Sequence, residues 1–399
     1  MMRFVGIDIG GERHALAVVD EDGTVLTKST FFGEEAAGYK RVRELLGNAD
    51  DCLVAMEATG HYWRNLFAFL ASLGFEVALL NPLRTRRFAE EELERTKTDS
   101  VDALGIARFA AQKRPAPTPV SDEVTAELRE LVRLRTRYVD ELSDRMRQLP
   151  RAVDLGFPEF TRHVRIRTLL ATAILARYPT ARSFARVSVR KLARLTYDGR
   201  HRVGETLARA LIEGAKVSVG NHHSEPYQLH VKYTCADIEL LRGRVKQLEQ
   251  DIERKLQTHE VGKLLTTIDG VGTQTAACLI AELGDPSRFR DAAALASYVG
   301  VVPRLRQSGK RAFSGARGLP LGNARLRHRL WMPTLVAVRK NPWLRAHYEH
   351  LLAAGKRPKV AIVACMRKLL GAIYSVARNR RPFVPHLATA LHEQPMTAG

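Results

Sequence analysis

The chain has 399 residues, with 63 Lys and Arg against 43 Asp and Glu, so it carries a net charge of +20 and a pI near 10.1. This length exceeds the usual size of one hydrophobic core, and a hydrophobic content of 45% predicts a globular protein of two or three domains rather than a disordered chain. The charge predicts a polyanionic partner, above all nucleic acid. No apolar run approaches about 18 residues and no signal-peptide pattern begins the sequence, so we expect a cytoplasmic protein that does not enter a membrane.

The four cysteines stand far apart in the sequence and form no Cys-x-x-Cys pair. That spacing excludes a zinc ribbon and predicts reduced thiols packed in the interior. They are Cys52, Cys235, Cys278 and Cys365.

The first part of the chain alternates between short apolar strands and turns. Residues 4–27 read as two strands around a turn, and the Asp-Gly pair in "DEDG" is typical of a hairpin. A further apolar run ends at Glu57, a helix over "YWRNLFAFLASLG" closes at Gly74, and "FEVALLNP" reads as a strand. Strands that first form a hairpin and then alternate with helices predict a mixed α/β sheet, here a domain of residues 1–115.

A pair of aspartates stands at the start of the next predicted helix, in "KTDSVDAL". Asp99 and Asp102 are three residues apart, so they lie on one helical face and repel each other unless a cation lies between them. A metal site is therefore one interpretation. The alternative is that Asp99 caps the helix and Asp102 is an ordinary solvated residue.

Two more carboxylates belong to the apolar strands. Asp8 lies inside "FVGIDIG", where an unpaired carboxylate is costly unless it is paired or bound to metal, and Glu57 ends a neighbouring strand. If both strands share one sheet and the helix of Asp99 and Asp102 packs across their ends, four carboxylates converge. Such a cluster suits Mg²⁺, and two such ions suit phosphodiester chemistry.

The middle of the chain, residues 120–260, is predicted to be helical and of coiled-coil type. Three prolines in "QKRPAPTPVSD" mark a linker before it. Apolar residues recur at spacings of three and four in residues 124–149 and again in residues 238–252, so the two helices could pair with each other or with another protomer. Between them, residues 161–217 read as a mostly helical, basic segment.

The C-terminal region, residues 261–385, is predicted to be mainly helical. "LLTTIDGVGTQTAACLIAELG" reads as two helices around a Gly-x-Gly turn, a helix-hairpin-helix-like element whose amides at Gly270 and Gly272 could face a phosphate. A hairpin that binds nothing is an equal alternative. Residues 301–382 hold 19 Lys or Arg and one acid, Glu349, a net charge of +18, which predicts nucleic-acid binding here. Residues 386–399 lack periodicity and are expected to form a disordered tail.

Ser308 is the candidate nucleophile of this basic region. Four cations surround it and could hold a phosphate, and Gly309 permits a close backbone approach. No histidine lies near it in the sequence, so metal ions of the carboxylate cluster would have to activate its hydroxyl. A Ser-Gly turn without a catalytic role is the alternative, and Ser314 is a second candidate. The flanking cations are Arg304, Arg306, Lys310 and Arg311.

Three motifs in this order resemble those of the DEDD transposases of the insertion-sequence-110 (IS110) family: "GIDIGGERHALAVVD", "MEATGHYW" and "KTDSVDALGIA". The segments "FRDAAALASYVGVVPRLRQSGKRAFSG" and "GNARLRHRLW" resemble the C-terminal transposase domain of the same family. The resemblance implies a RuvC-like N-terminal domain of the ribonuclease H superfamily, in which Mg²⁺ is bound by Asp8, Glu57, Asp99 and Asp102. It also implies that Ser308 attacks DNA and that a noncoding bridge RNA guides the reaction. The two heptad segments predict a dimer or tetramer, since a recombinase must hold at least two DNA duplexes together.

We therefore expect a DNA transposase or recombinase that moves an insertion sequence by joining donor and target DNA. The nearest alternative is a RuvC-type nuclease that hydrolyses DNA with the carboxylates alone. A sugar kinase of the actin-like superfamily is weaker, because the chain shows no second glycine-rich phosphate loop and no adenosine motif. A nucleic-acid-binding protein without catalysis would leave Asp8 in its strand unexplained.

Overall fold

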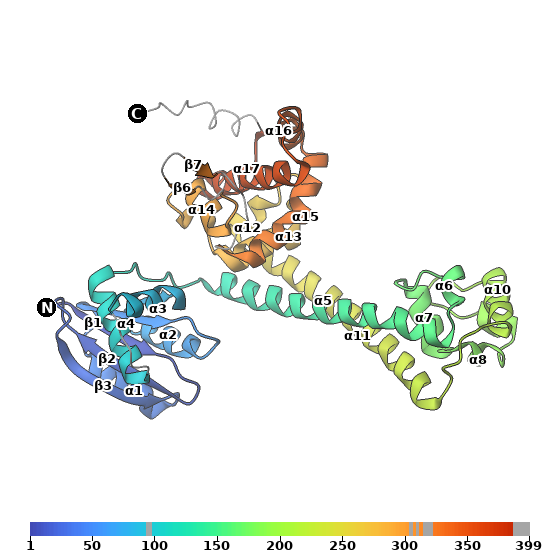
Figure 1. Cartoon of the computed structure of the whole chain (residues 1–399), viewed down its shortest axis with the longest axis horizontal. Helices are drawn as coiled ribbons and strands as arrows, with labels where there is room; N and C mark the ends of the chain where they lie inside the picture. The colour runs from blue at the N-terminus through green and yellow to red at the C-terminus, as the bar shows by residue number, and fades with distance from the viewer. Residues whose placement is uncertain (93–97, 303–305, 309–310, 314–321, 386–399) are drawn as a thin grey trace. The chain divides into compact units, whose positions relative to one another are not determined.

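The computed structural model describes residues 1–92, 98–302, 306–308, 311–313 and 322–385 (Figure 1). The chain divides into two compact units, Met1–Ser121 and Asp122–Gly399. The first unit contains a mixed sheet covered by helices, and the second is almost entirely helical. These features confirm the prediction of an α/β domain followed by helical regions.

The first unit is built on a five-stranded sheet with the strand order β3-β2-β1-β4-β5. β1 pairs antiparallel with β2 and parallel with β4, while β3 and β5 form the edges. The strands are β1 Arg3–Asp8, β2 Arg13–Val19, β3 Val25–Gly33, β4 Cys52–Glu57 and β5 Glu76–Leu80.

Helices cover both faces of this sheet because successive strand side chains point to opposite sides. On one face Phe4 and Ala55 pack against Ala107 of α4, together with α3. On the other face Val5 and Val54 pack against α1 and α2. The helices are α1 Ala36–Leu46, α2 Trp63–Ser72, α3 Pro82–Glu91 and α4 Asp99–Lys113.

The predicted strand ending at Glu57, the helix α2, the strand β5 and the helix that starts at Asp99 are all confirmed. The residue that caps the N-terminus of α4 is not Asp99. Thr98 is the N-cap, and its hydroxyl accepts a hydrogen bond from the Val101 amide at 3.3 Å. The interpretation that Asp99 caps the helix is therefore wrong, because Asp99 is already the first helical residue.

Two long helices, α5 Glu123–Gly156 and α11 Glu225–Leu256, lie side by side in the second unit and form what we call the arm (Figure 1). Ion pairs join Glu127 to Lys255, Arg135 to Glu249 and Arg145 to Asp237. Residue numbers rise along one helix as they fall along the other, so the two helices are antiparallel. The two predicted amphipathic segments thus pair with each other within one chain.

Five short helices connect the two arm helices and enclose a core of their own. We call residues 157–224 the tip module. Its core contains Phe157, Phe160, Phe184 and Ile174, all fully buried, and joins the ends of α5 and α11. The helices are α6 Phe160–His163, α7 Leu169–Arg177, α8 Ala181–Phe184, α9 Val189–Ala193 and α10 Glu205–Lys216.

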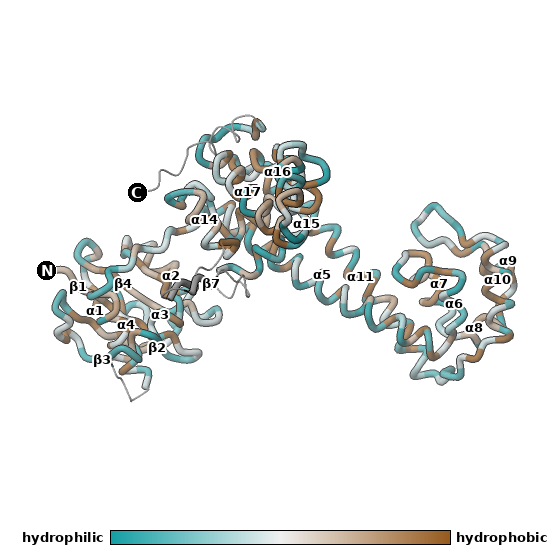
Figure 2. Tube along the Cα trace, turned by 45° about the horizontal axis from the view of Figure 1, so that its top comes forward, coloured by the Kyte–Doolittle hydropathy of each residue, from teal (hydrophilic) through white to brown (hydrophobic). Residues whose placement is uncertain are grey.

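The remaining helices form a separate C-terminal core at the other end of the arm, to which Leu128 and Ile252 contribute. Between Val132 and Leu149, α5 has no buried residue, and the middle of the arm is largely hydrophilic in Figure 2. The elements of the core region are α12 Glu260–Leu265, α13 Thr273–Leu283, η1 Pro286–Arg288, α14 Ala292–Val299, β6 Arg306–Ser308, β7 Arg311–Phe313, α15 Ala324–Lys340, α16 Pro342–Ala353 and α17 Pro358–Asn379.

One helix in the described part of the chain, α17, is long and apolar enough to cross a membrane by length and composition alone. Arg367 and Lys368 interrupt its apolar sequence, and Cys365, Leu369 and Ile373 are fully buried in the C-terminal core. α17 is therefore a core helix. All four cysteines are free and buried, which confirms the prediction of packed thiols.

Candidate active site

Two of the four predicted carboxylates stand side by side at the carboxyl ends of two inner strands of the sheet. Asp8 ends β1 and Glu57 ends β4, and these parallel strands are in register, with Ile7 opposite Met56. Because side chains alternate along a strand, Asp8 lies on the face of Gly6 and Glu57 on that of Ala55, the face covered by α4.

α4 brings the other two carboxylates to this end of β1 and β4, since Asp99 and Asp102 occupy its first turn. The helix lies directly against β1 at Gly6. A Cβ atom on Gly6 would lie 2.1 Å from the Ala103 carbonyl oxygen and 2.2 Å from the Ala107 nitrogen, so only glycine allows this approach. The absence of a side chain at Gly6 thus sets the height of Asp102 above the sheet.

Asp8 interacts electrostatically with the other three carboxylates. The pKa of Asp8 is raised to about 6, first by burial and then by the charges of the other three carboxylates. A divalent cation among them would reverse this effect, because it would favour the ionised form. Within the described residues, no three such side chains converge closely enough to hold a metal ion as they stand. The donor set fits a hard cation in its chemistry, and binding would require the carboxylates to turn toward a common centre.

Two threonines that the sequence did not single out position Glu57. Thr85 on α3 donates a hydrogen bond from its hydroxyl to Oε1, and the Thr59 hydroxyl lies 3.5 Å from Oε2. The Thr85 hydroxyl oxygen also lies 3.0 Å from the Pro82 carbonyl oxygen, and Thr85 is almost fully buried. No local sequence pattern marks Thr85, because α3 and β4 meet only in the folded sheet.

Ser308 is the last residue of β6, where it pairs with Arg311 of β7 in a two-stranded antiparallel ribbon. The sequence suggested a turn or loop at Ser308, because strands of three residues are too short to show alternation. Arg306 lies on β6 opposite Phe313. The remaining predicted neighbours, Arg304, Lys310 and Ser314, lie outside the described residues.

Gly270 and Gly272 lie in the turn between α12 and α13, as the sequence suggested. Gly270 has a φ of +99°, and a Cβ atom there would lie 2.5 Å from that of Ala337. This glycine is therefore required by the fold, whether or not a ligand is bound. The Val271 amide donates to the Ile268 carbonyl at 2.8 Å and is already used.

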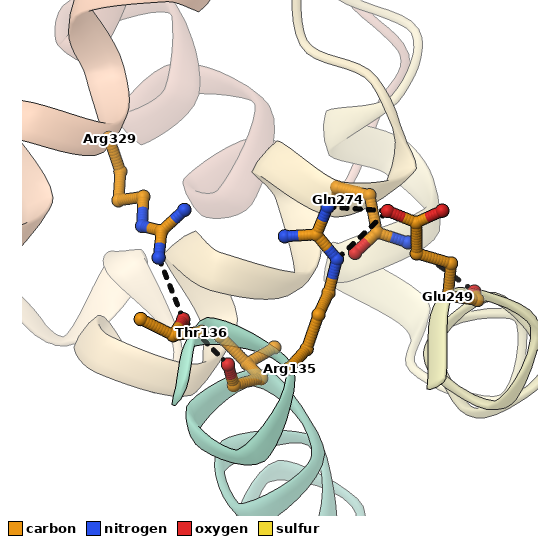
Figure 3. Close-up of polar contacts among 6 residues, drawn as sticks. Arg135, Thr136, Glu249, Gln274 and Arg329 are labelled. Atoms are coloured by element: carbon orange, nitrogen blue, oxygen red, sulfur yellow. Dashed lines mark hydrogen bonds and ion pairs between the residues drawn. The ribbon is translucent and has the colours of Figure 1, made fainter. Parts of the chain in front are cut away.

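Polar contacts with the arm hold the first turn of α13 that follows this hairpin (Figure 3). The Gln274 side-chain amide donates to the Glu249 backbone carbonyl at 3.3 Å, and the Glu249 carboxylate accepts from Arg135 Nε at 3.0 Å. Arg329 of α15 donates to the Thr136 hydroxyl at 2.8 Å. The position of α13 is thus coupled to both arm helices.

Known proteins resemble both ends of the chain. Residues 5–158 match a transposase family model for the DEDD domain of the IS110 group, and residues 262–349 match the model described as "Transposase IS116/IS110/IS902 family". Residues 159–261 lie outside both matches.

Similar proteins come from several bacteria. The uncharacterized 44.8 kDa protein of insertion element IS116 from Streptomyces clavuligerus is 27% identical over 390 residues, which cover 96% of each chain. The mini-circle putative transposase for IS117 from Streptomyces coelicolor is 28% identical over 402 residues, 95% of each chain. The pilin gene-inverting protein of Moraxella bovis is 26% identical over 343 residues, 84% of this chain and 83% of that protein.

Proposed function

Since the chain belongs to the IS110 family of transposases and is an enzyme that acts on DNA, we propose that it cuts and rejoins DNA strands with a carboxylate-bound metal and a serine nucleophile. The metal ligands in this proposal are Asp8, Glu57, Asp99 and Asp102, the metal is Mg²⁺, and the nucleophile is Ser308.

The observation that carries the proposal is the half-buried Asp8, whose pKa is raised to about 6 first by burial and then by the charges of the other three carboxylates. Carboxylates are brought together in this way where a cation offsets their charge. Mg²⁺ prefers oxygen ligands, and when bound it would supply positive charge to the phosphodiester and assist deprotonation of the nucleophile. Thr85 and Thr59 would act as positioning residues, because each contacts Glu57.

Ser308 would attack the phosphorus of a DNA strand through its Oγ. The Oγ–P bond forms, the P–O bond to the departing sugar hydroxyl breaks, and the proton of the serine hydroxyl is released while the departing oxygen gains one. The ester retains the energy of the phosphodiester, so a second strand end can reverse the reaction without ATP. Arg306 and Arg311 lie on the same ribbon as Ser308, and Arg304 and Lys310 are close to it in the sequence. In the proposal these cations, together with the amides of Gly270 and Gly272, contact DNA phosphates.

A noncoding guide RNA and a homo-oligomer complete the proposal. The pilin gene-inverting proteins among the relatives act, by their name, on gene orientation, and such a reaction requires two DNA duplexes to be held together. A dimer or tetramer meets that need. The apolar spacing of residues 124–149 and 238–252 does not support an oligomer, because α5 and α11 pair with each other within one chain.

The test separates this recombinase from a hydrolytic nuclease. Labelled DNA is incubated with Mg²⁺ and the protein, and the products are run on a denaturing gel. We expect a DNA–protein adduct with the wild type, no adduct with Ser308→Ala, and neither cleavage nor adduct with Asp102→Asn or in EDTA. DNA binding should remain near that of wild type in both variants.

Ser314→Ala is the matched control. An adduct that survives Ser308→Ala but is lost in Ser314→Ala would transfer the nucleophilic role to Ser314. Free cut ends without any adduct in the wild type would identify a hydrolytic nuclease, in which water replaces the serine. Full cleavage by the Asp102→Asn variant would overturn the metal site.

A further inference from the structure

We propose that the tip module binds the phosphate backbone of a nucleic-acid duplex, at a site separate from the carboxylates and from the Ser308 ribbon. Neither family match covers residues 159–261, and most of the tip module lies within that range. The proposal depends on the proposed function only in assuming that the protein encounters nucleic acid.

The first observation is the excess of exposed positive charge. Residues 161–217 contain 13 Lys or Arg and only three acids, a net charge of +10, and every one of the 13 cations is exposed. The cations are Arg162, Arg165, Arg167, Arg177, Arg182, Arg186, Arg190, Lys191, Arg194, Arg200, Arg202, Arg209 and Lys216.

The second observation is that these cations lack the ion pairs that five cations of the arm form. Arg135, Arg145, Arg147, Arg254 and Lys255 all form ion pairs with acids of the arm helices. Among the described residues, none of the 13 cations of the tip module forms such a pair. A solvated protein surface normally mixes its charges, so this surface is left uncompensated for an external anion.

The third observation is a rigid hairpin that presents part of this charge. Between α9 and α10, the Tyr197 amide donates to the His201 carbonyl at 3.2 Å, and Thr196 pairs with Arg202 in an isolated β-bridge. Gly199 supplies the turn with a φ of +79°. The hairpin is therefore ordered by its own contacts before any ligand binds.

The only acid of this hairpin, Asp198, is already engaged. Its Oδ1 accepts from the amides of Arg200 and His201 at 3.0 and 2.7 Å, and its Oδ2 lies 2.7 Å from His201 Nδ1. Arg200 and Arg202 are left exposed on either side of His201. Arg190, Lys191 and Arg194 precede them on α9 and at its C-terminal end, and their spacing of three and four places them on one side of that turn. These five residues are the centre of the proposed surface.

The aromatic residues favour a duplex over single strands. Proteins that bind single strands stack bases on exposed aromatic rings. In the tip module, Phe157, Phe160 and Phe184 are fully buried, Tyr178 packs on Phe184, and Tyr197 stacks on His201. A surface rich in exposed cations, with its phenylalanine rings buried, is suited to phosphate contacts, which are independent of sequence.

The test measures binding of the full-length protein to a duplex DNA and a duplex RNA of the same sequence, by fluorescence anisotropy in EDTA over a series of salt concentrations. Each phosphate contact contributes about 0.9 to the slope of log K against log salt for duplex DNA. We expect Arg200→Gln with Arg202→Gln to lower the slope by about 1–2, and Arg190→Gln, Lys191→Gln and Arg194→Gln added to them to lower it further.

The control is Arg147→Gln with Arg254→Gln, which removes the same charge from exposed residues paired within their own helices. A lower slope than the control on DNA or on RNA supports the proposal and identifies which duplex the module binds. Equal slopes for the two double variants on both duplexes would overturn it. Because EDTA suppresses metal-dependent chemistry, the result is independent of the Ser308 and carboxylate tests.

Discussion

Gly6 shows how one residue without a side chain fixes the geometry of the candidate active site. Any Cβ there would overlap the backbone of α4 at Ala103 and Ala107. A backbone cannot yield as the end of a flexible side chain can, so the helix would have to move away from the sheet. Asp99 and Asp102 would move with it.

We expect Gly6→Ala to lower the free energy of unfolding of the first unit by about 1–3 kcal/mol and to reduce DNA cleavage strongly. Gly105→Ala on α4 is the matched control, because a Cβ there meets nothing within 4 Å. That control should be neutral or stabilise by about 0.5–1 kcal/mol, since alanine favours a helix. Thermal melts and cleavage assays of both variants check this, and a Gly6→Ala protein with normal stability and activity would contradict the close packing.

Asp8 gives the pH dependence of the same site. Its pKa in the folded, metal-free protein is about 6, above the ordinary value of 3.8. A raised carboxylate pKa favours folding fully below the ordinary value, and the advantage is lost as the pH rises through the folded value. We therefore expect the wild type in EDTA to lose stability between about pH 4 and pH 7, and Asp8→Asn to lose less.

Mg²⁺ should raise the melting temperature of the wild type at pH 7.5 and have little effect on Asp8→Asn, because binding to the folded form alone stabilises it. Calorimetry at several pH values with and without Mg²⁺ gives both comparisons. Identical pH profiles for the two proteins would show that neither burial nor the neighbouring carboxylates raise the pKa of Asp8.

Among the helices and strands, the elements with long and regular patterns could be predicted from sequence. The apolar spacing of residues 124–149 and 238–252 marked α5 and α11, and alternation marked the sheet. α1 and α3 were missed, because their short amphipathic patterns fall between stronger ones. The partner of each arm helix was also beyond the sequence, since both intra-chain and inter-chain pairing satisfy the same spacing.

The candidate site was predictable only in part, because some of its contacts join segments that are far apart in the sequence. Asp8 and Glu57 stood out because charged residues are rare in apolar strands, and Asp99 and Asp102 because they share a helix face. Thr85 carries no such mark. The requirement for Gly6 comes from a helix about 100 positions away in the sequence, which no local pattern contains.

α12 begins with an uncommon cap that makes it sensitive to pH. His259 is the N-cap, and its Nδ1 accepts a hydrogen bond from the Gly262 amide at 3.0 Å. Only the neutral ring can accept there. Burial lowers the pKa of His259 below its ordinary value of 6.5, so the stabilisation is present above that value and is lost as the pH falls through the folded value.

We expect the C-terminal core to lose stability as the pH falls below about 6.5 in the wild type and to change less in His259→Asn, because asparagine caps helices without titrating over this range. His259→Ala should cost about 1 kcal/mol at pH 8. Denaturant unfolding at pH 5 and pH 8 measures both effects, and an equal loss at pH 5 in wild type and His259→Asn would rule out this cap as the cause.

At the scale of the whole chain, the buried clusters of the described residues respect the division between Met1–Ser121 and Asp122–Gly399, since each cluster draws its residues from one unit. The segment between the end of α4 and Ser121 also belongs to the first unit. Thr118 donates its amide to the Val77 carbonyl at 2.8 Å and accepts from the Leu79 amide at 2.9 Å, along the edge strand β5.

We therefore expect two unfolding transitions in calorimetry, and a fragment of residues 1–121 that folds by itself. Asp8→Asn should shift only the transition of the first unit, and His259→Ala only that of the second. A fragment that ends at residue 113 should be less stable than 1–121 by about 1–2 kcal/mol, because it loses the Thr118 hydrogen bonds. A single transition that both variants shift equally would show that the units unfold together.

The arm sets the distance between the C-terminal core and the tip module. Val132 in one core and Leu149 in the other are separated by about 25 Å of continuous α5, at 1.5 Å per residue. On duplex DNA this equals about seven base pairs. Loop changes would leave this interval unaltered, whereas seven residues inserted in each arm helix would add about 10 Å while keeping the helical faces aligned. If both cores contact one duplex, the arm would fix the spacing of the two contacts, in steps of about three base pairs per heptad.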